Sequence, residues 1–147
     1  MMRYKLYING GGESADKQGL ILGVGAVSVL RQPAELKDYI TNDNALMDGI
    51  RVLPGLAPKV ASRDIQLTFG IRARSHSEFI TRYEAFVATL EKGTVDLRID
   101  TSENGGAFIK GTTYHLLYVS AAQYSEYNGR LAKVVVKFRE PNPKNRD

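Results

Sequence analysis

Three carboxylates and a lysine lie close together in the chain and are the residues whose types could do chemistry. Asp96, Asp100 and Glu103 precede Lys110, and carboxylates of this kind hold the divalent metal ions of many nucleases. Asp96 and Asp100 are an even number of residues apart, so a strand would place both on one face. Glu103 and Lys110 fall in a glycine-rich run, however, and no Glu-x-Lys pair stands on a strand. A small metal-dependent enzyme built on the three carboxylates is therefore a rival hypothesis, which we do not favour.

Other motifs for catalysis or cofactor binding are weak or missing. The two histidines, His76 and His115, have no histidine or acidic partner at metal-ligand spacing, and we expect His115 to be a hydrogen-bonded structural residue. Residues 22–28 contain a G-x-G but lack the third glycine and the helix pattern of a dinucleotide loop, which favours a bulged strand. There is no cysteine and no G-x-S-x-G elbow. We expect no enzyme activity, no metal ion and no cofactor.

The bulk composition is that of an ordinary globular protein. The chain has 147 residues, of which 43% are hydrophobic and 24% charged, and its net charge is +4. This length predicts one domain over residues 1–147. The basic residues are scattered along the chain, whereas nucleic-acid binding usually needs them on one face. The apolar run at residues 20–30 is too short to cross a bilayer. We therefore expect a soluble, cytoplasmically made protein without membrane or specific nucleic-acid partners.

The clearest local structure is a strand, a helix and a second strand between residues 63 and 99. Apolar residues alternate over residues 65–71 and again over 95–99, which is the period of a half-buried strand. Ser75 and Glu78 form a capping box, and Lys92-Gly93 is a typical helix end. The apolar residues of the intervening helix share one face: Phe79, Ile80, Tyr83, Phe86, Val87 and Leu90.

The remaining elements are predicted from shorter patterns. Alternation predicts strands at residues 4–8, 112–121 and 131–139, and an apolar run with two glycines predicts another strand at residues 20–30. Pro33 near a first turn suggests a short helix at residues 33–39. We expect a mobile loop at residues 100–111, a turn at 124–129 with the hairpin signal Asn128-Gly129, and a flexible charged tail at about 141–147.

Periodicity fails between residues 40 and 62. Residues 41–44 (TNDN) are of types that favour turns, and Pro54-Gly55 and Pro58 interrupt the rest. Only residues 50–53 could pair as a strand. Long segments of this kind are usually functional or disordered. We interpret about residues 41–62 as a protruding arm or extended hairpin. The expected fold class is α+β: a mostly antiparallel, sandwich- or barrel-like sheet flanked by one long helix, with the arm projecting from it.

The order and type of residues resemble a known family. The runs 49–55 (GIRVLPG) and 59–69 (KVASRDIQLTF) are similar to the N-terminal ring-forming domain of phage distal tail proteins and their prophage relatives. The similarity continues through 79–86 (FITRYEAF), 93–97 (GTVDL), 114–118 (YHLLY) and 134–143 (VVVKFREPNP). It extends over about two thirds of the chain. Distal tail proteins often carry a second, C-terminal β-domain after the region of similarity. We therefore expect either a short form of the distal tail protein or a related tail tube or terminator subunit.

The resemblance implies a function without catalysis. It predicts a structural component of a phage or prophage tail, at the distal tail, baseplate or tube, that assembles with itself into a ring, commonly a hexamer, and with other tail proteins. Its location would be the virion tail. We expect the arm to contact the neighbouring subunit through Arg51, Leu53, Leu56, Val60 and Arg63, although the arm could instead fold back on its own sheet. The alternative from another class is a small α+β module that binds a ligand or nucleic acid.

Overall fold

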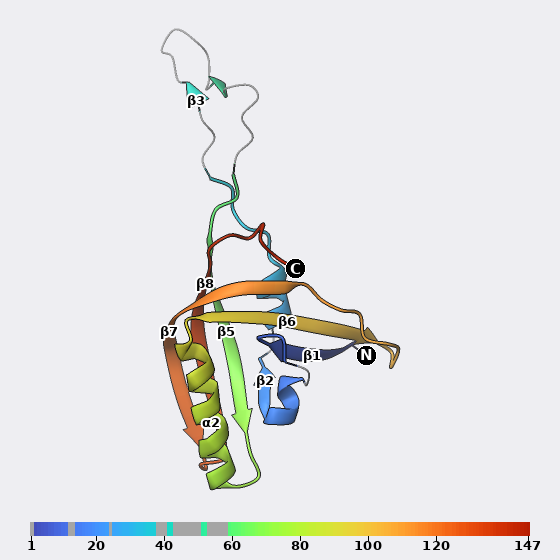
Figure 1. The fold of residues 1–147 in the computed structure, drawn as a ribbon, viewed down its shortest axis with the longest axis vertical. Coiled ribbons are helices and arrows are strands. Elements are labelled where there is room, and N and C mark those ends of the chain that lie inside the picture. The colour runs from blue at the N-terminus through green and yellow to red at the C-terminus, as the bar shows by residue number, and fades with distance from the viewer. Residues whose placement is uncertain (1, 12–13, 24, 38–40, 43–50, 53–58) are drawn as a thin grey trace.

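The computed structural model describes residues 2–11, 14–23, 25–37, 41–42, 51–52 and 59–147. Six antiparallel strands form one sheet that curls into a half-barrel (Figure 1). In spatial order the strands are β1 (Met2–Ile8), β6 (Thr94–Glu103), β7 (Thr113–Tyr127), β8 (Leu131–Glu140), β5 (Arg63–Arg72) and β2 (Leu20–Leu22). The described residues also contain a 3-10 helix η1 (Ala15–Gln18), two α-helices, α1 (Ala26–Arg31) and α2 (His76–Glu91), and a separate antiparallel pair, β3 (Thr41–Asn42) and β4 (Arg51–Val52). The predicted fold class is confirmed.

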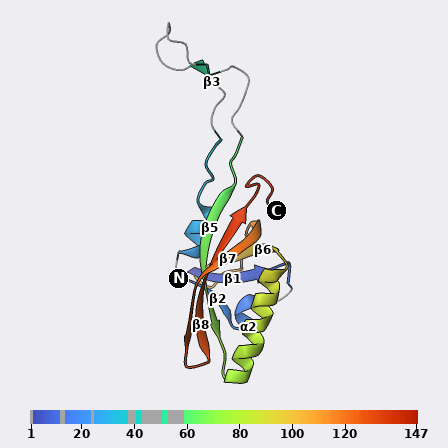
Figure 2. The same ribbon diagram turned by 90° about the vertical axis from the view of Figure 1, so that its left-hand side faces the viewer.

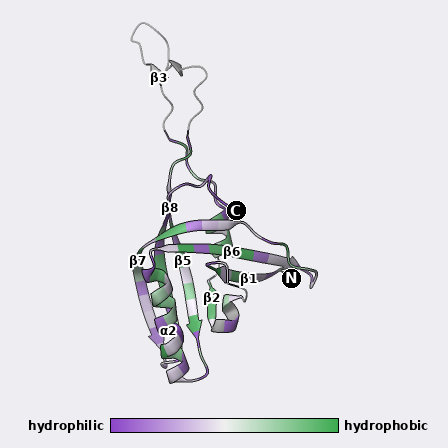
Figure 3. Ribbon diagram, in the orientation of Figure 1, coloured by the Kyte–Doolittle hydropathy of each residue, from purple (hydrophilic) through white to green (hydrophobic). Residues whose placement is uncertain are grey.

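The core lies between the sheet and α2. Alternate residues of β5 and β8 face inward, and the register sets Phe69 opposite Val134 and Leu67 opposite Val136. Phe86 of α2 packs against Phe69 with ring centroids 5.3 Å apart. The same alternation of apolar and polar residues is visible along β6 (Figure 3). One apolar stripe of α2 thus covers one face of the half-barrel, as a single amphipathic helix requires.

The predicted ends of α2 are confirmed. The Ser75 hydroxyl accepts a hydrogen bond from the Glu78 backbone N–H at 3.2 Å, which satisfies one of the free donors of the first turn. The helix ends at Glu91, Lys92 is its C-cap, and Gly93 follows with a φ of 86°, a left-handed conformation that glycine adopts without steric cost. Ile80, which we placed on the apolar face, is 37% exposed, so the buried stripe is narrower than predicted.

Two predictions for the first third of the chain are wrong. Residues 20–30 are not one strand: β2 ends at Leu22, and α1 begins at Ala26 after Gly25. The apolar run therefore folds as a short edge strand and a six-residue helix, whose Ala26 and Leu30 are buried. Residues 33–37 are not helical, because their backbone pairs with the segment that leads into β5. Residues 38–39 lie outside the described residues.

Strands β6 and β7 extend beyond their predicted limits. The loop predicted at residues 100–111 is wrong for residues 100–103, which belong to β6 because β1 pairs with this strand from Met2 opposite Glu103 to Ile8 opposite Leu97. β7 continues to Tyr127, and only residues 128–130 turn. Asn128 and Gly129 have φ values of 52° and 62°, so the hairpin signal was placed correctly. None of the described helices is long and apolar enough to cross a membrane.

Candidate assembly site at the base of the arm

The two sides of the predicted arm pair with each other where they leave the sheet. Lys37 donates its backbone N–H to the Lys59 carbonyl at 2.7 Å, and Ala61 donates to the Glu35 carbonyl at 2.8 Å. Further out, β3 and β4 form their own antiparallel pair, with Thr41 opposite Val52. Figures 1 and 2 both place this pair apart from the half-barrel, at the end of the molecule opposite α2. The described parts of the arm are therefore those of an extended hairpin.

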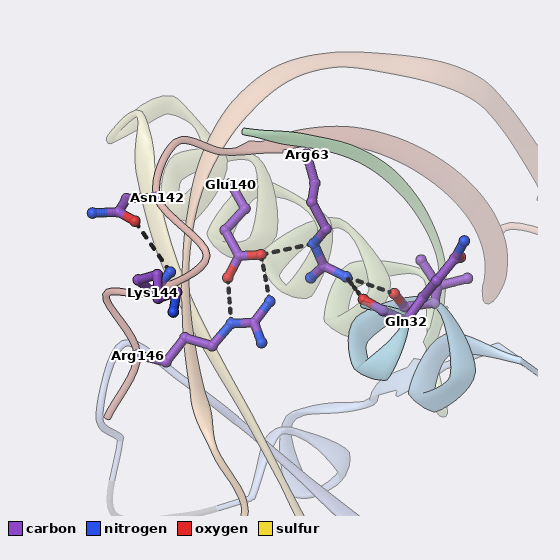
Figure 4. A network of polar contacts seen from close by, with 7 residues as sticks. Gln32, Arg63, Glu140, Asn142, Lys144 and Arg146 are labelled. Atoms are coloured by element: carbon purple, nitrogen blue, oxygen red, sulfur yellow. Dashed lines mark hydrogen bonds and ion pairs between the residues drawn. The ribbon is translucent and has the colours of Figure 1, made fainter. Parts of the chain in front are cut away.

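An ion-pair network fixes the base of this hairpin (Figure 4). Arg63, the first residue of β5, donates from Nε to Glu140 Oε1 at 2.7 Å. Glu140, the last residue of β8, also accepts two hydrogen bonds from Arg146, both at 2.8 Å. Arg63 Nη1 donates to the carbonyls of Val29 and Gln32 at the end of α1, at 3.2 and 2.7 Å. The network thus joins the arm base, two strands, α1 and the C-terminal segment.

The network is buried and its charges are arranged to favour ionised Glu140. The Glu140 side chain is fully buried and Arg63 is only 8% exposed. Burial by itself raises the pKa of Glu140, but the hydrogen bonds and charges of Arg146 and Arg63 outweigh it, so the net shift of this pKa is downward. Arg63 Nη2 is buried and has no hydrogen-bond partner among the described atoms. Arg63 therefore gains its stabilisation from Nε and Nη1 alone.

The predicted interface residues are spread over this region. Arg51 lies in β4, where its backbone is opposite Asn42, and Leu53 and Leu56 lie outside the described residues. Val60 is partly buried and forms an isolated bridge with Leu36. The side chain of Arg63 points into its own subunit rather than away from it. Their contacts with a neighbouring subunit stay a prediction.

Sequence reasoning missed Glu140 and Arg146, although one of them carried a signal. Glu140 continues the alternation of buried residues along β8, because it follows Phe138 at an interval of two. The buried apolar positions of this strand are Ala132, Val134, Val136 and Phe138. Arg63 likewise precedes Ile65 in the buried phase of β5, and the register sets it opposite Glu140. Opposite charges at facing buried positions indicate an ion pair. Arg146 gave no such signal, because its segment has no periodicity.

The carboxylates considered for metal binding are not brought together. Asp96 Oδ1 accepts a hydrogen bond from His115 Nδ1 at 2.8 Å. Arg98 lies between Asp96 and Asp100 on the same face of the strand. Asp100 binds Arg98 at 2.9 Å and accepts from the Gly111 backbone N–H at 3.0 Å. Glu103 is exposed at the end of β6. The described residues contain no cluster of three histidine or acidic residues that could hold a metal ion.

His115 has the structural role that we expected, and it also contacts the C-terminal segment. Its Nε2 lies 3.1 Å from Asp147 Oδ2, and Asp147 exchanges backbone hydrogen bonds with Thr113 at 2.8 and 3.3 Å. The hydrogen bond to Asp96 raises the pKa of His115; burial lowers this pKa, but the charges of Asp96 and Asp147 raise it further. Residues 146 and 147 thus pair with the start of β7. Flexibility of the tail at 141–147 stays a prediction about its motion.

Comparison with known proteins identifies a shared fold. The chain matches no protein-family model, and no curated protein is similar to it in sequence. Among solved structures, it is similar to the Dit protein (gp 19.1) of phage SPP1, described as a paradigm of the hub adsorption apparatus in phages that infect Gram-positive bacteria. The similarity covers 96% of this chain with a TM-score of 0.57 and 16% sequence identity. The chain aligns with 51% of the Dit chain, about half its length.

Proposed function

We propose that this protein is a non-enzymatic structural component of a phage or prophage tail, acting at the distal tail, baseplate or tube. The observation that carries the proposal is the shared fold with a phage hub protein over nearly the whole chain. The resemblance of the residue pattern to phage distal tail proteins supports it independently of the fold. The proposal places the protein in the virion tail, in contact with other tail proteins, and treats residues 1–147 as one domain.

We further propose that copies of the chain assemble into a ring, which we expect to be hexameric. A ring of identical subunits needs a head-to-tail interface, in which one surface of a subunit meets a different surface of the next. The hairpin arm supports this because it projects from one end of the half-barrel, and because a buried network anchors its base to β5, β8 and α1. An arm with a firm base can hold its far part in a constant direction.

The first test is the mass in solution, measured by light scattering coupled to size exclusion over a wide concentration range. A discrete oligomer, visible as rings by electron microscopy, supports the proposal. Leu53→Asp in the arm should reduce assembly while circular dichroism shows an unchanged fold, and Lys144→Glu in the exposed C-terminal segment is the matched control. A monomer at every concentration, also when mixed with other tail proteins, contradicts the ring.

A further inference from the structure

A groove runs between α2 and the segment that contains η1 and the end of β1. Its volume is about 580 Å³, within the range of sites that bind small ligands or peptide side chains. The floor consists of four apolar residues: Ile8, Leu20, Ile71 and Phe86. The elements that line the groove, α2, η1, β1, β2 and β5, lie apart from β3 and β4 (Figures 1 and 2).

One wall of the groove is a strip of small side chains on α2. Thr81, Ala85 and Thr89 follow one another at intervals of four residues and line the groove, which places them one above another on the helix. Both threonine hydroxyls donate to carbonyls of their own helix, Thr81 to Ser77 at 3.1 Å and Thr89 to Ala85 at 3.0 Å. The donor of each hydroxyl is therefore used, and another chain can approach this wall without leaving a donor unsatisfied.

The rim of the groove is positively charged. Lys17, Arg82 and Lys92 line it, and its described lining residues include no aspartate or glutamate. Arg82 is held in place by the Arg72 carbonyl at 2.7 Å and by an ion pair with Glu78. Lys17 and Lys92 are exposed, and neither has an ion-pair partner among the described side chains. The groove therefore favours an acidic segment that carries apolar side chains.

The chain itself contains a segment of this chemistry. Residues 43–48 read DNALMD, so that two aspartates flank alanine, leucine and methionine, and no lysine or arginine occurs between residues 38 and 50. The segment belongs to the arm, between β3 and β4. β3 and β4 lie at the end of the molecule opposite α2 (Figures 1 and 2). We infer that the groove along α2 binds residues 43–48 of a second copy of this chain.

The two surfaces are different, so this contact is head-to-tail and can repeat from copy to copy. The inference rests on the proposed function in one respect, namely that copies of the chain associate. Its own test does not need a ring. A labelled synthetic peptide of residues 41–52 is titrated with the dilute full-length protein, and binding is followed by fluorescence anisotropy. Amide resonances of α2 show where the peptide binds.

We expect saturable binding with shifts at Thr81, Ala85 and Thr89. Lys17→Glu combined with Lys92→Glu should weaken binding by roughly tenfold or more, since two ion pairs become repulsions. A peptide with Asp43→Lys and Asp48→Lys should recover binding to this variant. Lys133→Glu and Lys144→Glu, exposed lysines outside the groove, are the matched charge controls. If the groove variant (Lys17→Glu with Lys92→Glu) and the control variant (Lys133→Glu with Lys144→Glu) bind the peptide equally, the charge effect is unspecific and the inference is overturned.

A steric pair of variants tests the same site without charge. Ala85→Trp fills the groove, whereas Ala88→Trp places the same side chain at an exposed position of α2 that does not line it. Ala85→Trp should abolish peptide binding and Ala88→Trp should leave it unchanged, with thermal melts confirming that both fold. No binding of the peptide to the wild-type protein at about 1 mM also overturns the inference. The proposed ring would survive that result if light scattering still shows an oligomer.

Discussion

Replacing Glu140 by leucine should destabilise the protein more than any other single change in the network at the base of the arm. The carboxylate is fully buried and accepts three hydrogen bonds from two guanidinium groups. Its loss leaves Arg63 as a buried cation that binds only the carbonyls of Val29 and Gln32. Removing one partner of a buried ion pair costs about 3–5 kcal/mol.

The structure also predicts a smaller loss of stability when either arginine that binds Glu140 is replaced. Arg63→Met should cost about 1–3 kcal/mol, because Glu140 keeps both hydrogen bonds from Arg146. Arg146→Met should cost about 1–2 kcal/mol, because its side chain is 26% exposed and water can replace part of the interaction. The double variant Arg63→Met/Glu140→Leu removes both buried charges together. It should be less destabilised than the sum of its two single variants by at least about 1 kcal/mol.

Thermal and urea unfolding at low protein concentration measure these differences, so that any association contributes little. For a domain of this size each kcal/mol corresponds to about 2–4 °C, so Glu140→Leu should lower the melting temperature by about 6–20 °C. Glu140 has a lowered pKa, so ionisation stabilises the fold above the pKa of the unfolded chain. This contribution is lost as the pH falls through the lowered value, and the wild type should approach Glu140→Gln at acidic pH. A cost below about 1 kcal/mol for Glu140→Leu, or additive single variants, would refute the reasoning.

Three further predictions concern other parts of the half-barrel. Phe86→Ala should cost about 3–5 kcal/mol in urea unfolding, because it removes a buried ring that packs on Phe69; an unchanged midpoint would mean that α2 is not essential to the core. His115→Gln should be less stable than wild type below about pH 6.5 and equal to it at alkaline pH. The pKa of His115 is raised in the folded protein, so the charged imidazole stabilises the fold below the pKa of the unfolded chain, and this stabilisation is lost as the pH rises through the pKa of the folded protein. Melts across this pH range measure it, and a constant difference would contradict the role of the imidazolium. Gly129→Ala should lower the melting temperature, because the residue has a φ of 62° and a Cβ there would lie 2.6 Å from His76 Nδ1; Gly10→Ala, with similar φ but open space around it, separates the steric effect from the backbone effect.

The parts of the fold that could be predicted from sequence are those with local causes. Alternation predicted β5 and β8, and the capping pair Ser75 and Glu78 set the start of α2. The predictions were wrong where pairing with a segment distant in sequence determines the local structure. Residues 33–37 are extended because residues 59–61 pair with them, and β6 reaches Glu103 because β1 lies beside it. The run at 20–30 is ambiguous in principle, since a short apolar stretch suits a buried strand and a buried helix equally.

The sequence indicated the hairpin at residues 41–62 but not the ion-pair network at its base. The failure of periodicity between residues 40 and 62 indicated an arm, and β3 and β4 pair within it. Arg63 was predicted to contact a neighbouring subunit, and that contact stays a prediction; the structure shows its side chain bound to Glu140 in the interior. Its place in the buried phase of β5 could have shown this, because Ile65 and Leu67 follow at intervals of two. Arg146, which also binds Glu140, lies in a C-terminal segment without periodicity, so no local pattern in the sequence indicates this ion pair.

A buried ion pair is weak evidence for stability, since desolvation offsets most of its attraction, but it can specify one geometry among several. The network at the base of the arm has the arrangement that such a role needs. Apolar side chains could fill the same volume in several rotamers, whereas Glu140 is held by hydrogen bonds from Arg63 and Arg146 that depend on direction. Arg63 extends this constraint to α1 through Val29 and Gln32. These directional contacts restrict the geometry at the point where the hairpin leaves β5, and the proposed contact between the arm and a neighbouring subunit would need such a restriction.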